Sequence, residues 1–170
     1  CQDYALSGLH EGIAYGVIAD GCSSGGQTDV GARLMSLSTV AAIKEHWGMR
    51  RSIASLEAAQ ETNVRQRLIL GGIKESLGLT TSDMLATCAY IYMTPEGGFA
   101  HLRGDGVVAR VQRDGTTFLY RYDWANNTPF YPAYADDDYV SFVKVHGGSD
   151  AKSLRSQIWR SKDGTHVDLG

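Results

Sequence analysis

The stretch that most constrains the structure is an apolar run that stops at an acidic residue, Ile13-Ala14-Tyr15-Gly16-Val17-Ile18-Ala19-Asp20-Gly21. Its first seven residues are apolar on both faces of an extended chain, which predicts a strand inside a core. An unpaired carboxylate at the end of such a strand is costly, so Asp20 needs a partner, and a metal ion would supply one. Gly21 could offer its carbonyl to the same cation. The alternative is a plain Asp-Gly turn.

The flanking sequence predicts one further strand and two helices. Tyr4 to Leu9 predicts a strand, joined to the apolar run by a polar turn at 10–12. A helix capped at Thr28 is expected to end near Gly48. A second helix is expected from Ser52 onward. Its apolar residues are predicted to face inward: Ile53, Leu56, Val64, Leu68 and Ile73.

From Met84 onward the periodicity changes to two, which is typical of strands. Strands are predicted over 85–93, 99–102, 107–111, 117–122 and 139–145, with turns at 94–98 and 113–115. Residues 152–159 fit either a helix or a loop. Two strands, two long helices and then a meander of strands predict an α+β fold with antiparallel sheets, in a single domain over residues 1–170.

Composition excludes several classes of function. The chain has 170 residues, of which 43% are hydrophobic, and its formal charge is −3. No basic field exists to hold nucleic acid or anionic lipid, so neither a nucleic acid nor a membrane is expected as a partner. Three cysteines without a C-x-x-C pair argue against a disulfide framework or a cysteine zinc site. These features predict a reducing, cytoplasmic setting.

Four short motifs occur in an order that carries a family resemblance: Gln2-Asp3, Asp20-Gly21, Ala86-Thr87-Cys88 and Gly104-Asp105-Gly106. Over about residues 1–145 they resemble the metal-dependent phosphatases of the protein phosphatase 2C (PPM) family, especially its shorter bacterial branch. The resemblance implies an α-β-β-α sandwich of two face-to-face antiparallel sheets with flanking helices. It also implies two Mn²⁺ or Mg²⁺ ions, which activate a water to hydrolyse phosphoserine or phosphothreonine. We therefore expect a monomer that acts on a phosphorylated protein substrate.

The resemblance also assigns roles to individual residues. Asp20 would bridge both metals, Gly21 would give its carbonyl to one of them, and Asp3 would act through a metal-bound water. Thr87 and Asp105 match supporting positions near the site. Hard cations prefer such oxygen ligands, and paired ions can activate a bridging water.

Two departures from the family pattern concern the site. Cys22 stands where many eukaryotic members carry a histidine that is taken as the general acid. The family also places two carboxylates in its last third: Asp150 is the candidate for the first, and either Asp163 or Asp168 fits the second. We favour Asp168 as a metal ligand because it enters an expected strand. The short spacing from Asp150 indicates segments missing after about residue 145, or a degenerate site.

Three further interpretations stay open. One is a catalytically impaired binding or regulatory module on the same fold. Another is a hydrolase that uses Cys1 as an N-terminal nucleophile, with the α-amino group as base. Finally, a cluster of aromatic residues could bind a ligand, although alternating aromatic residues on strands more often form a core or a sheet surface: Phe118, Tyr120, Tyr122, Trp124, Phe130, Tyr131 and Tyr134.

Overall fold

The computed structural model describes residues 2–50, 56–95, 97–124, 129–135, 154–162 and 165–169. Its first half holds β1 (Asp3–His10), β2 (Ile13–Asp20), α1 (Thr28–Arg50), α2 (Leu56–Leu77) and the short 3-10 helix η1 (Thr81–Met84). Its second half holds β3 (Cys88–Thr94), β4 (Gly97–Arg103), β5 (Gly106–Val111), β6 (Thr117–Trp124), the 3-10 helix η3 (Pro132–Ala135), β7 (Leu154–Lys162) and β8 (Thr165–Asp168).

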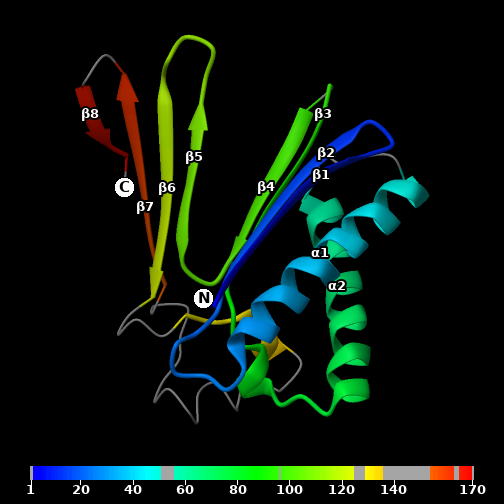
Figure 1. Cartoon of the computed structure of the whole chain (residues 1–170). Helices are drawn as coiled ribbons and strands as arrows, with labels where there is room; N and C mark the ends of the chain where they lie inside the picture. Colours follow the sequence, from blue (N-terminus) through cyan, green and yellow to red (C-terminus); the bar gives the residue numbers. More distant parts are fainter. Residues whose placement is uncertain are drawn as a thin grey trace.

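The strands form two four-stranded antiparallel sheets in chain order, β1-β2-β3-β4 and β5-β6-β7-β8. The two sheets lie close together at the β4–β5 connection and diverge toward the opposite ends of their strands (Figure 1). Both long helices cover the outer face of the first sheet. The expected α+β fold with two antiparallel sheets packed together is confirmed.

The main core lies between the helices and the first sheet. Strand alternation explains its composition, because successive side chains of β3 point to opposite faces. Cys88, Tyr90 and Tyr92 are buried on the helix side. Ile91 and Met93, each nearly half exposed, line the space that faces the second sheet.

The predicted inner face of the second helix is wrong. Val64 and Leu68 are 48% and 70% exposed, although apolar periodicity placed them inside. The buried face of α2 instead consists mainly of small or polar residues, which let the helix pack closely against α1: Ala58, Ala59, Thr62, Gln66 and Leu70.

Other boundaries also differ from expectation. Residues 152–159 were expected to form a helix or a loop, but Leu154–Lys162 forms β7, because residues 154–161 pair with β6. The strand expected from residue 85 begins at Cys88, after η1, which is fixed by a reciprocal capping box between Thr80 and Asp83. The first helix continues past Gly48 to Arg50. The strand expected over 139–145 lies outside the described residues. Within the described part of the chain, no helix has the length and apolar character needed to cross a membrane.

A buried glutamine joins the helices to the sheet, and its removal should destabilise the fold. Gln66 is 1% exposed; its Nε2 donates to Thr39 Oγ1 (2.5 Å), and its Oε1 accepts from Arg103 Nη1 (2.7 Å). We expect Gln66→Ala to lower the free energy of unfolding by about 3 kcal/mol, because it leaves a cavity and unsatisfied polar partners. Leu68→Ala on the exposed side of α2 should change it by less than about 0.5 kcal/mol. Urea unfolding measures both, and equal stabilities for the two variants would contradict this role of Gln66.

Candidate active site

The β1–β2 hairpin brings two carboxylates together. Antiparallel pairing places Asp3 directly opposite Asp20, the last residue of β2. Both residues are exposed, and their carboxyl groups lie within hydrogen-bonding reach of each other. Like charges directly opposite each other destabilise a sheet. The Asp3–Asp20 pair therefore lowers the stability of the fold, which indicates a role other than a structural one.

The chain around Asp20 is tied down on both sides. Thr87 clamps it with two hydrogen bonds: the Asp20 amide donates to Thr87 Oγ1 (3.0 Å), and the Thr87 amide donates to the Asp20 carbonyl (2.8 Å). The Gly21 amide donates to the Gln2 carbonyl (3.2 Å), and the Cys22 amide donates to the Leu85 carbonyl (2.8 Å). The end of β2 is therefore held in place by β1 and by the segment that precedes β3.

A third carboxylate reaches the same place from the connection between the two sheets. Asp105 lies in the turn between β4 and β5 and is half-buried. Together with Asp3, Asp20 and Thr87 it lines a cleft of about 470 Å³. The remaining lining residues are apolar or small apart from one tyrosine: Tyr4, Ala5, Ile18, Ala19, Ala89, Leu102, Gly106 and Val107.

The electrostatics of this cleft favour a cation. The pKa of Asp20 is raised above its ordinary value by partial burial, by the hydrogen bond and charge of Asp3, and by the charge of Asp105. Among the described residues that line the cleft there is no lysine, arginine or histidine. Three acidic groups thus share a cleft without a basic side chain in its walls.

The raised pKa of Asp20 leads to a test on the metal-free protein. Ionising Asp20 costs more in the folded state than in the unfolded chain, and this cost is fully present above the raised pKa. It disappears as the pH falls through that pKa. We therefore expect metal-free Asp20→Asn to have a higher Tm than the wild type at pH 7, with a difference that shrinks on acidification. Thermal unfolding at a series of pH values measures this, and a lower Tm for the variant at pH 7 would contradict it.

The donors fit a hard divalent cation in kind, because they are carboxylate oxygens with unbalanced negative charge. They do not form a complete cage: within the described residues, no group of three or more His, Cys, Asp or Glu side chains could hold a metal ion. Asp168 lies on β8 opposite Trp159, at the outer edge of the second sheet, and does not line the cleft (Figure 1). Asp150 and Asp163 lie outside the described residues. The late ligand therefore stays a prediction, as does the role of the Gly21 carbonyl.

Cys22 faces a different environment from the cleft. It packs with Tyr131 and Tyr134 and bonds to Ser24 Oγ at 3.2 Å. Burial opposes its ionisation, but hydrogen bonds from Ser24, Tyr131 and nearby backbone lower its pKa. Cys22 is not among the residues that line the cleft, so it is not placed to replace the histidine that is taken as the general acid in many eukaryotic members. Cys1, the alternative nucleophile, lies outside the described residues.

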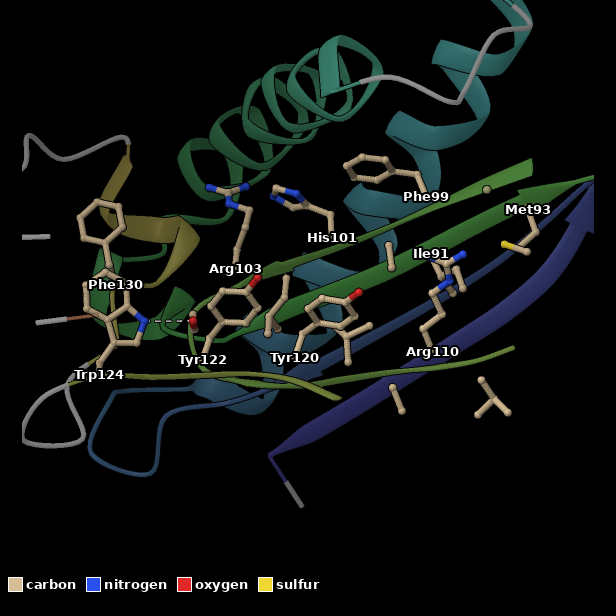
Figure 2. Close-up of a pocket in the computed structure, with 17 residues that line it drawn as sticks. Ile91, Met93, Phe99, His101, Arg103, Arg110, Tyr120, Tyr122, Trp124 and Phe130 are labelled. Carbon is tan, nitrogen blue, oxygen red and sulfur yellow. Dashed lines mark hydrogen bonds between the residues drawn. The ribbon is translucent and has the colours of Figure 1, made fainter. Parts of the chain in front are cut away.

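A larger cavity of about 1080 Å³ lies between the sheets (Figure 2). Four members of the aromatic cluster line it: Tyr120, Tyr122, Trp124 and Phe130. Of these, Trp124 donates its indole N–H to the carbonyl of Gly104, next to Asp105 (3.0 Å). Sequence reasoning missed this contact, and its only signal was the aromatic clustering.

Comparison with known proteins agrees with this arrangement. The family model described as "Protein phosphatase 2C" matches residues 1–137, which include Asp3, Asp20, Thr87 and Asp105. The match covers most of the chain, so the chain belongs to the protein phosphatase 2C family. No curated protein and no solved structure matches it. Family membership indicates a phosphatase of the hydrolase class.

Proposed function

We propose that this domain hydrolyses phosphoserine and phosphothreonine in proteins with the help of two Mn²⁺ or Mg²⁺ ions. The observation that supports this most strongly is the meeting of Asp3, Asp20 and Asp105 in one cleft whose described walls carry no basic side chain. Acidic clusters of this kind are costly unless a cation neutralises them. In a member of a phosphatase family, a cation bound by these carboxylates would also be placed to promote phosphate hydrolysis.

In this proposal each site residue has a defined task. Asp20 and the Gly21 carbonyl would hold the ions, and Asp3 would orient a water beside them. When bound, divalent cations neutralise phosphoryl oxygens and lower the pKa of water, so no side-chain nucleophile is needed. Thr87 fixes the Asp20 backbone through its two hydrogen bonds and so keeps the carboxylate in the cleft. A phosphorylated protein is the proposed substrate and a monomer the proposed state.

The direct test is metal-dependent hydrolysis by the purified domain. Metal-free protein should be inactive on a small aryl phosphate, gain activity with Mn²⁺ or Mg²⁺, and lose it again with EDTA. Phosphoserine and phosphothreonine peptides should be cleaved faster than a matched phosphotyrosine peptide. Activity that persists unchanged in EDTA, or no activity with either metal, would contradict the proposal.

A binding module on the same fold is the second candidate. It is favoured by the position of Asp168 outside the cleft, together with the incomplete ligand set within the described residues. Under this alternative the domain would bind a phosphopeptide in a titration but release no phosphate at any concentration of Mn²⁺. The two candidates thus differ in phosphate release, measured on the same peptide.

A further inference from the structure

The turn that carries Asp105 is fixed by a hydrogen bond from the other sheet. Gly104 and Gly106 both have positive φ angles, +100° and +145°, so the turn has a backbone shape that residues with side chains rarely adopt. Trp124, the last residue of β6, donates its indole N–H to the Gly104 carbonyl at 3.0 Å (Figure 2). Since Gly104 follows β4 of the first sheet, this bond joins the two sheets beside the cleft.

The same glycine also touches the support of Asp20. A Cβ atom at Gly104 would lie 3.0 Å from the Cγ2 of Thr87, so the backbone passes close over that side chain. Thr87 in turn accepts the hydrogen bond from the Asp20 amide. A shift of the Gly104 peptide would therefore move Asp105 and press on Thr87 together, and would disturb two of the three acidic groups.

The β4 end of the turn is held by two hydrogen bonds, one at Gly104 and one at Arg103. The Trp124 ring packs against Phe130, with 6.4 Å between the ring centroids, which limits the freedom of the indole N–H. Arg103, the residue before Gly104, donates to the buried Gln66 at 2.7 Å. The Arg103 bond holds the end of β4, whereas the Trp124 bond holds the turn itself.

We propose that Trp124 is a positioning residue for the metal cleft: its indole N–H fixes the Gly104 carbonyl and thereby sets Asp105 against Asp20. This inference rests on the proposed function, since it concerns the affinity of the cleft for a divalent cation. Groups that orient the surroundings of a metal site typically change its affinity by 10- to 100-fold, and we expect about tenfold here because Trp124 acts through the backbone.

The test compares two tryptophan-to-phenylalanine variants. Trp124→Phe keeps an aromatic ring beside Phe130 and removes the N–H donor. Trp47→Phe is the matched control, because Trp47 also donates its indole N–H to a backbone carbonyl, that of Glu11 at 3.2 Å, at the far end of the β1–β2 hairpin. In calorimetric titrations with Mn²⁺, Trp124→Phe should bind about tenfold more weakly with unchanged stoichiometry, and Trp47→Phe should match the wild type.

Two readouts separate positioning from general damage to the fold. In metal-free protein, amide hydrogen exchange in the peptide that spans 104–106 should be faster in Trp124→Phe than in either the wild type or Trp47→Phe. The kcat of Trp124→Phe on an aryl phosphate should recover toward the wild-type value at saturating Mn²⁺. Reduced stoichiometry, or Mn²⁺ affinity within twofold of wild type, overturns the inference and leaves the proposed function standing. A wild type that binds no Mn²⁺ overturns both.

Discussion

Asp20→Asn should reduce Mn²⁺-dependent hydrolysis of an aryl phosphate by about 10³-fold or more in kcat/KM. Asp20 stands opposite Asp3, shares the cleft with Asp105 and is assigned to hold the ions. Removing its charge removes several kcal/mol of transition-state stabilisation that a held metal supplies, and each 1.4 kcal/mol is about tenfold in rate. Because the metal-free variant is expected to be at least as stable as the wild type, the loss would report on chemistry and not on unfolding.

The matched control is Asp114→Asn. Asp114 lies in the β5–β6 turn and bonds to Lys162 at 2.9 Å, at the opposite end of β5 from the Asp105 turn (Figure 1). It is exposed and takes no part in the cleft, so its replacement should leave kcat/KM within about twofold, as is usual for a surface ion pair. Equal activity of the Asp20 and Asp114 variants would remove Asp20 from the site.

Gly21→Ala should have the second largest effect, on both stability and metal binding. A Cβ atom at this position would lie 2.7 Å from two backbone oxygens, those of Gln2 and Thr28. Neither oxygen can move without shifting β1 or the start of α1, so we expect a loss of about 3 kcal/mol in the free energy of unfolding. The shift would also displace Asp20, and Mn²⁺ affinity should fall at least tenfold in the folded fraction.

Gly16→Ala, on β2, the strand that precedes Gly21, provides the comparison. A Cβ there would have Ile91 Cγ2 as its nearest neighbour at 3.4 Å, which is ordinary van der Waals contact. Alanine also lowers the entropy of the unfolded chain relative to glycine, so its stability should equal or exceed that of the wild type. Urea unfolding and Mn²⁺ titration of both variants measure the difference. If Gly21→Ala were as stable as Gly16→Ala, the close backbone approach at Gly21 would be wrong.

Local patterns explain why much of the fold could be predicted. The apolar run that ends at Asp20 forms β2, and the Thr28 helix forms α1, because both are determined largely by neighbours in sequence. The α2 face and β7 could not be predicted in this way. Val64 and Leu68 are exposed because the inner face of α2 carries the polar network around Gln66. Strand β7 forms because it pairs with β6. Both outcomes depend on contacts between distant segments.

The site shows the same division. The pairing of Asp3 with Asp20 follows from the register of a hairpin with a short turn, so this part of the site can be predicted from local sequence. The position of Asp105 in the cleft depends on how the two sheets pack together, and only the family resemblance predicted it. Aromatic clustering drew attention to Trp124, but it could not indicate the bond to Gly104, because the two residues lie 20 positions apart and Gly104 follows a strand of the other sheet.

Calorimetric titration of Mn²⁺ into the metal-free domain, as wild type and as Asp20→Asn, tests the central claim most directly. The account predicts saturable binding by the wild type, with a stoichiometry near two, and loss of that binding in Asp20→Asn. Absence of binding by the wild type, or equal binding by the two proteins, would contradict the assignment of this acidic cleft as a metal site.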